Sequence, residues 1–135
     1  MNQDFPVHGV EMSVLLVVGD LGRARAFYRD LLGATELRQY GGTSVVMQFE
    51  GTSLVLVTGG GPTPDKPTIE FRPPTDAHTV SHELTIKVPD CWDAYQVLVG
   101  RGVEFLSPPV EYDWEIRCFF RDPDGHLLEI SQTKP

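Results

Sequence analysis

Two stretches of this sequence repeat one order of apolar spacing and turn signals, and this repeat constrains the fold more than any other feature. In the first stretch, a strand-like run at residues 12–18 precedes Asp20, after which apolar residues recur at helical spacing as far as Gly33. Glycine turns then separate three short strand-like segments at 36–40, 43–49 and 52–58. The pattern predicts one strand, one helix and three further strands.

The second stretch has the same order of elements. A strand-like run at residues 83–88 leads to Asp90, and a helical pattern then ends at Gly100 and Gly102. Short strands are predicted at 103–106, 115–121 and 126–131, with the turn sequence Asp-Pro-Asp-Gly between the last two. Glycines and five prolines fill the segment between the stretches, which predicts a linker at residues 59–80.

The two stretches also agree in register, which is a stricter criterion than general similarity. Ser13 and Glu83 both stand seven residues before the aspartate that opens a helical pattern. Val55 and Glu129 both stand four residues after the glycine of a predicted turn. We therefore expect two copies of one βαβββ module.

The predicted modules cover about residues 10–58 and 81–132 of a single domain that spans 1–135. Neither module is large enough to bury much apolar surface alone, so the two should pair around one core. The predicted fold class is α+β, because strands predominate and each helix lies beside a group of strands.

Composition narrows the choice of partners. The chain has 11 basic and 19 acidic residues, a net charge of −8 and no local basic cluster, so nucleic acid is not an expected partner. The longest aliphatic run, residues 14–18, is too short to cross a bilayer, and residues 1–4 lack the features of a signal peptide. We expect a cytoplasmic protein without a membrane partner, in which Cys91 and Cys118 stay free thiols.

Several segments carry a resemblance to a known superfamily. They are VVGDL at 17–21, AFYRDLLG at 26–33, VPD at 88–90, RGVEF at 101–105 and RDPDGHLLEI at 121–130. The sequence resembles the vicinal oxygen chelate superfamily, which includes glyoxalase I, the bleomycin and fosfomycin resistance proteins and the extradiol dioxygenases. The resemblance implies two paired βαβββ modules that form a cupped mixed sheet around a cavity, with the helices outside. It also implies a homodimer, because members often dimerise.

The resemblance further implies where metal ligands would lie, at Ser13, Val55, Glu83 and Glu129. Only Glu129 is of the type that the family pattern expects, and Val55 has no donor atom. A catalytic divalent metal normally needs three protein ligands, so no cofactor is expected, with a weakly bound hard cation as the alternative. Glu11 is a substitute ligand if the first strand begins early, because it would share a strand face with Ser13.

Histidines offer a second metal hypothesis. His78 and His82 are four residues apart, a spacing that chelates metal on a helix, but the surrounding sequence favours an extended chain. In a strand the same spacing spans roughly 13 Å, which is too far to share one ion. His82 remains an alternate ligand if a bulge turns it towards the face of Glu83.

Other residues are candidates for lining the cavity. Strand alternation places Glu83 and Glu129 on the cavity face, where two carboxylates would repel each other and one could hold a proton as a general acid or base. The alternative interpretation is that both are solvated surface residues. The remaining candidates for the cavity are Phe49, Tyr112, Trp114 and Arg117, together with Ser13 and Val55. For Trp114 the alternative is an edge residue that covers the core.

The leading functional hypothesis is a protein that binds a small organic molecule with an incomplete family metal site. Such a protein either sequesters its ligand, as drug-resistance relatives do, or transforms it without metal. The rival is a metal-dependent enzyme, a glyoxalase I-like lyase or an extradiol-type dioxygenase, with Glu129 as a ligand. The ligand set at the four aligned positions favours the first hypothesis.

Overall fold

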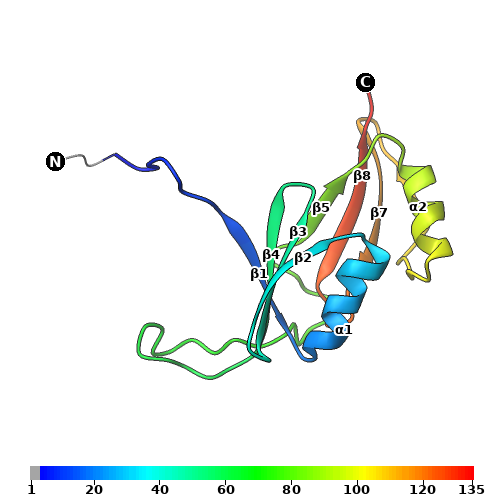
Figure 1. Cartoon of the computed structure of the whole chain (residues 1–135). Helices are drawn as coiled ribbons and strands as arrows, with labels where there is room; N and C mark the ends of the chain where they lie inside the picture. The colour runs from blue at the N-terminus through cyan, green and yellow to red at the C-terminus, as the bar shows by residue number, and fades with distance from the viewer. Residues whose placement is uncertain (1–3) are drawn as a thin grey trace.

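Residues 4–135, described by a computed structural model, form two four-stranded sheets with helices packed beside them (Figure 1). The predicted α+β class is confirmed. Residues 1–3 lie outside the described residues. They belong to the segment 1–4, for which the sequence predicts no signal peptide. The elements are β1 (Ser13–Val18), α1 (Leu21–Ala26), the π-helical segment η1 (Phe27–Leu31), β2 (Thr35–Tyr40), β3 (Ser44–Phe49), β4 (Thr52–Thr58), β5 (Leu84–Lys87), α2 (Cys91–Gly100), β6 (Val110–Glu111), β7 (Glu115–Arg121) and β8 (Leu127–Thr133).

The two sheets share one topology. Their strand orders are β1-β4-β3-β2 and β5-β8-β7-β6, and in each the first strand pairs in parallel with the last strand of its half. Leu15 lies opposite Val55 in the first sheet, and Thr85 lies opposite Glu129 in the second. The sheets therefore repeat in register as well as in strand order.

Matching caps begin the two main helices. The Asp20 carboxylate accepts a hydrogen bond from the backbone N–H of Arg23 at 2.9 Å, and that of Asp90 accepts from Asp93 at 3.0 Å. Each bond satisfies one of the amide donors that a helix leaves free in its first turn. Gly33 follows the first helical segment with a φ of +83°, a conformation that a glycine adopts without strain.

Two sequence expectations differ from the structure. The helix expected to continue as far as Gly33 is α-helical only to Ala26 and then widens into η1. The strand expected at 103–106 is wrong, because Phe105 makes only an isolated bridge to Phe120. The backbone N–H of Val103 bonds back to Leu98 at the end of α2, which ties this segment to the helix terminus. The outer strand of the second sheet is instead β6.

The halves meet where η1 packs against the β7–β8 hairpin. The Tyr28 hydroxyl donates to Asp122 Oδ2 at 2.7 Å, and both residues are buried. The Phe27 and Phe120 rings pack 6.2 Å apart between their centroids. These contacts tie the first half of the chain to the second through side chains.

Two segments extend away from the sheets. Residues before β1 run outwards as an arm, and the linker between β4 and β5 forms a long loop (Figure 1). The loop has local structure, since Gly60 and Phe71 form an antiparallel bridge. Within the described part of the chain, no helix has the length and apolar character needed to cross a membrane.

Candidate functional site

Strand β8 places Glu129 on the face of its sheet that points away from α2. Its neighbours Leu128 and Ile130 are buried on the opposite, helix-facing side, as strand alternation requires. Across the sheet, Glu129 pairs with Thr85 of β5 on one side and with Phe119 of β7 on the other. Only 7% of the Glu129 surface is exposed, because side chains of the two neighbouring strands surround its carboxyl group.

Burial raises the pKa of Glu129 from 4.5 to about 7. The carboxyl group of Glu83 adds to this effect through a hydrogen bond and its charge, and Glu115 adds a further negative charge. Arg117 acts in the opposite direction. Near neutral pH, Glu129 therefore exists in both protonation states, beside carboxylates that favour the protonated one.

Arg117 brings a cation and aromatic surface to the same face. Its guanidinium forms an ion pair with Glu115 at 3.0 Å and lies 4.7 Å from the centre of the Tyr112 ring and 5.3 Å from that of Phe119. The second oxygen of Glu115 accepts from the Ser131 hydroxyl at 3.2 Å. The face thus combines a protonatable acid, a cation held between aromatic rings, and hydroxyl groups.

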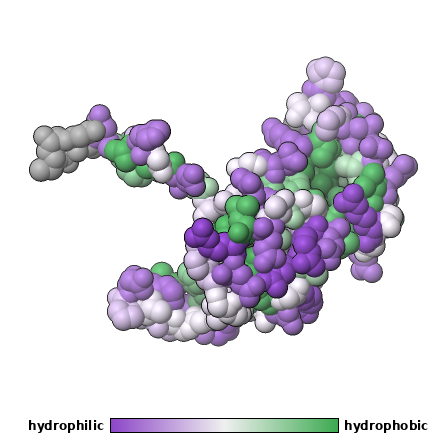
Figure 2. All heavy atoms as spheres, viewed as in Figure 1, coloured by the Kyte–Doolittle hydropathy of each residue, from purple (hydrophilic) through white to green (hydrophobic). Residues whose placement is uncertain are grey.

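Three hollows lie near this face and between the halves. The linker cavity, about 310 Å³, is bounded by residues 15–17, 72–84 and 125–127. The inter-module cleft, about 520 Å³, is mostly apolar and includes Leu54, Leu84 and Ile86. Figure 2 shows apolar atoms in a hollow over β5 and β8. The third hollow, about 410 Å³, lies between η1 and residues 102–106.

The predicted site residues distribute unevenly over these features. Glu83 lines both the linker cavity and the cleft, whereas His82 lines the first and Phe49 the second. Trp114 is 70% exposed. Within residues 4–135, the three hollows exclude the other predicted residues, which are Ser13, Val55, Tyr112, Trp114, Arg117 and Glu129.

The residues at the four family positions supply too few ligands for a catalytic divalent metal site. Glu83 and Glu129 contact each other, but Val55 lies opposite Leu15 in the first sheet, and Ser13 lies opposite Ser53. Glu11 lies before β1 on the exposed arm. No group of three or more His, Cys, Asp or Glu side chains with metal-binding geometry occurs among residues 4–135. Two carboxylates, a hydroxyl and an alkyl group are an inadequate donor set.

Sequence reasoning missed Glu115 and Phe119 as members of the face. A signal existed, because alternation from Arg117 along β7 places both on the same side as Arg117. Their proximity to Glu129 additionally requires the hairpin register, in which Phe119 pairs with Glu129. His126, which lines the linker cavity, was also missed, because it was assigned only to the start of the strand predicted at 126–131.

Comparisons with known proteins agree with the fold. A family model, described as the Glyoxalase/Bleomycin resistance protein/Dioxygenase superfamily, matches residues 12–130. No curated protein matches the chain. Among solved structures, a glyoxalase/bleomycin resistance protein/dioxygenase from Nocardioides is 24% identical, with a TM-score of 0.69 and coverage of 96% of this chain and 87% of that chain.

Two further solved structures illustrate the range of similar proteins. TnmS3, an antibiotic-binding protein from Streptomyces sp. CB03234, is 26% identical, with a TM-score of 0.66 and coverage of 93% of this chain and 98% of that chain. The fosfomycin resistance protein FosX from Listeria monocytogenes is 15% identical, with a TM-score of 0.69 and coverage of 95% and 96%. The FosX likeness concerns the fold.

Proposed function

Since the chain belongs to the glyoxalase/bleomycin resistance protein/dioxygenase superfamily, we propose that it binds a small organic molecule on the face around Glu129. The observation that carries this proposal is the Glu129 carboxyl group, nearly buried beside Glu83 with a pKa raised to about 7. Burying an ionisable group costs stability, and groups whose pKa is shifted by burial and by neighbouring charges concentrate at functional sites.

The two halves offer a ligand different chemistry. The second sheet presents Arg117, Thr85 and Ser131 beside Glu129, which suits polar or charged groups. On the equivalent face of the first sheet, Leu15, Val55 and Val46 form one apolar row in register and are incompletely buried. The proposed ligand has a polar end and an apolar body, a description that fits a drug-like molecule, and the similar protein TnmS3 is an antibiotic-binding protein.

The same face is suited to metal-independent acid–base chemistry. Protonated Glu129 can donate its proton to an oxygen or nitrogen of a bound molecule, and Arg117 can stabilise negative charge that develops there. The hydrogen bond and the charge of Glu83 raise the pKa of Glu129, so the role of Glu83 in this proposal is to keep Glu129 protonated in the free protein. Sequestration and catalysis therefore share one binding mode in this proposal.

The proposal is tested with a screen of organic compounds by thermal shift, because a ligand of the native state raises the melting temperature. A hit should lose at least tenfold in affinity in Arg117→Ala and in Glu129→Ala, measured by calorimetry. Arg29→Ala is the matched control, since Arg29 forms an exposed ion pair with Asp30 far from this face. Unchanged affinity in both site variants would contradict the proposal.

A metal-dependent enzyme is the rival function, and its specific support is the pair of carboxylates Glu83 and Glu129. Carboxylate oxygens suit a hard cation such as magnesium or manganese, held weakly by two side chains and water. We expect the purified protein to contain less than stoichiometric transition metal by mass spectrometry. One equivalent per chain that disappears in Glu129→Ala would favour the rival over the binding function.

A homodimer and a cytoplasmic location complete the proposal. Phe5 and Met12 on the N-terminal arm are 81% and 92% exposed, an unfavourable arrangement for an isolated chain. The inter-module cleft offers apolar surface that a second copy could cover. The absence of nucleic-acid and membrane partners, like the cytoplasmic location, stays a prediction from composition.

A further inference from the structure

One row of residues across the second sheet carries two cations beside Glu129. Ser131 of β8 pairs with Lys87 of β5 on one side and with Arg117 of β7 on the other. Paired residues on neighbouring strands project from the same face, and Ser131 stands two residues after Glu129 on β8, so the whole row shares the face of Glu129. Neighbouring strands lie about 5 Å apart, so the long side chains of the two cations flank Ser131 closely.

Lys87 brings a positive charge that no carboxylate neutralises. Its side chain is exposed, and it forms no ion pair with any of residues 4–135. Lys134, in contrast, pairs with Glu111 at 2.7 Å. Lys87 also lines the inter-module cleft, so it borders open space. Its ammonium is therefore available to a bound molecule.

Arg117 and Ser131 already hold one carboxylate of the protein itself. Arg117 Nη1 donates to Glu115 Oε1 at 3.0 Å, and the Ser131 hydroxyl donates to Glu115 Oε2 at 3.2 Å. A guanidinium has five N–H donors, and the Arg117 side chain is 36% exposed between the Tyr112 and Phe119 rings. The row thus binds a carboxylate in the free protein and keeps donors that a second one can reach.

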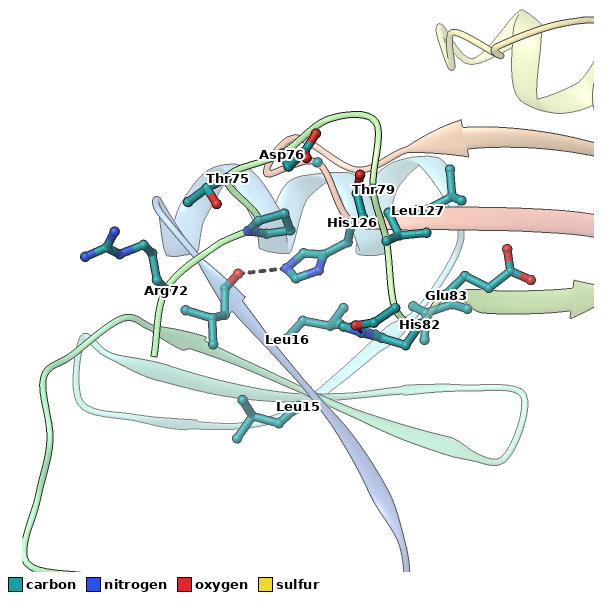
Figure 3. Close-up of a pocket in the computed structure, with 16 residues that line it drawn as sticks. Leu15, Leu16, Arg72, Thr75, Asp76, Thr79, His82, Glu83, His126 and Leu127 are labelled. Atoms are coloured by element: carbon teal, nitrogen blue, oxygen red, sulfur yellow. Dashed lines mark hydrogen bonds between the residues drawn. The ribbon is translucent and has the colours of Figure 1, made fainter. Parts of the chain in front are cut away.

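The other carboxyl groups of the face lie in the adjacent row. Glu83 accepts from the Thr85 hydroxyl at 2.8 Å and is hydrogen-bonded to Glu129. Figure 3 shows the Glu83 carboxylate directed away from the linker cavity and from His126. Because Glu83 and Glu129 contact each other, their negative charge is concentrated in that row. An anion is accordingly favoured beside Ser131 and disfavoured beside Glu129.

We propose that the ligand of this face is an organic anion, whose carboxylate lies over Ser131 between Lys87 and Arg117. The inference rests on the function proposed above and adds the charge of the ligand. The apolar row on the first sheet then receives the body of the molecule. Glu115 repels the ligand carboxylate and competes with it for the same donors.

Three probes with one ring system test the charge. They are 2-naphthoate, which is an anion, 2-naphthalenemethanol, which is neutral, and 2-naphthylmethylammonium, which is a cation. We expect 2-naphthoate to bind saturably with a Kd near or below about 1 mM in calorimetry. The alcohol should bind about tenfold more weakly, because it lacks charge-assisted hydrogen bonds, and the cation more weakly still. Added salt should weaken the binding of 2-naphthoate alone, since both cations are exposed to solvent.

Two substitutions should change the affinity for 2-naphthoate in opposite directions. Lys87→Gln removes one cation and should lower it about threefold, a size typical of an exposed charge pair. Glu115→Gln removes the competing charge but keeps an amide oxygen for the Ser131 hydroxyl, and should raise it about threefold. Arg29→Gln is the matched control, because it removes an equal charge far from the face and should leave the affinity unchanged. Circular dichroism checks that each variant is folded.

The outcomes separate this inference from the function on which it rests. If the alcohol or the ammonium probe binds as tightly as 2-naphthoate and still depends on Arg117 and Glu129, the charge assignment is wrong while the binding function stands. No saturable binding of 2-naphthoate up to about 20 mM would also overturn the inference. So would a lower affinity in folded Glu115→Gln, or equal effects of Lys87→Gln and Arg29→Gln.

Discussion

Glu129 shows how one side chain acquires an unusual proton affinity from its strand. Its position in the middle of β8, between β5 and β7, removes solvent from the carboxyl group. The neighbouring carboxyl groups then make ionisation still less favourable than burial alone would. The arrangement costs folding energy whenever Glu129 is charged.

The raised pKa of Glu129 predicts a pH-dependent loss of stability. Between pH 4.5 and about 7, the native state binds more protons at this position than the unfolded chain does, so stability falls as pH rises through this window. Above about pH 7 the loss of stability no longer changes with pH. Glu129→Gln removes the titration and should raise the free energy of unfolding by about 1–2 kcal/mol at pH 8, with little effect at pH 4.5.

Urea denaturation at the two pH values measures this difference. Glu104→Gln is the control, because Glu104 is exposed in the loop after α2 and should change stability equally little at both. An equal effect of Glu129→Gln at pH 4.5 and pH 8 would show that packing, and not ionisation, governs the position.

At the scale of elements, one hydrogen bond connects a helix of the first half to a hairpin of the second. Tyr28 in η1 donates to Asp122, and Asp122 also accepts from the backbone amides of Asp124 and His126. Tyr28→Phe removes the hydroxyl donor from a buried carboxylate and should cost about 1.5–3 kcal/mol. Chemical denaturation monitored by circular dichroism measures this loss.

Tyr40→Phe is the matched control for Tyr28→Phe. Tyr40 is exposed at the end of β2, and its hydroxyl accepts from the exposed Arg38 side chain. Its removal should cost less than about 0.5 kcal/mol. Equal losses in the two variants would mean that the Tyr28–Asp122 bond does not couple the halves.

The element scale also explains which parts of the fold the sequence predicts. Both Asp-capped helices and the duplicated strand order follow from local patterns, since caps, turns and apolar periods are all encoded nearby. The strand at 103–106 was mispredicted because its bond to Leu98 depends on the helix end, and β6 is too short to show a period. Local sequence likewise gives no signal that distinguishes η1 from α-helix.

The candidate site was less predictable than the fold. Alternation predicts a shared face for Glu83 and Glu129, but Glu83 lies just before β5, and the contact between the two carboxyl groups depends on how β5 and β8 pair. The position of Glu115 beside Glu129 depends on the register of the β7–β8 hairpin, and the linker cavity depends on the path of the chain between β4 and β5. No sequence periodicity describes either of them. Such properties arise from tertiary contacts between distant segments.

At the scale of the whole molecule, the N-terminal arm predicts self-association. Deleting residues 1–11 removes the exposed Phe5 together with Val7 and Val10, and should convert a dimer into a monomer in light scattering after size exclusion. Trp114→Ser is the control, because Trp114 is a comparably exposed aromatic residue outside the arm. The same mass for the deletion variant and the full chain would contradict a role of the arm in the dimer.

The strand order has a consequence for how the chain assembles during synthesis. In each sheet the last strand of the half is inserted between two earlier ones, β4 between β1 and β3, and β8 between β5 and β7. A ribosome releases β5 and β7 before the strand that joins them. Through that interval β5 has no native strand partner, so its backbone donors and acceptors are open to mispairing until β8 is released.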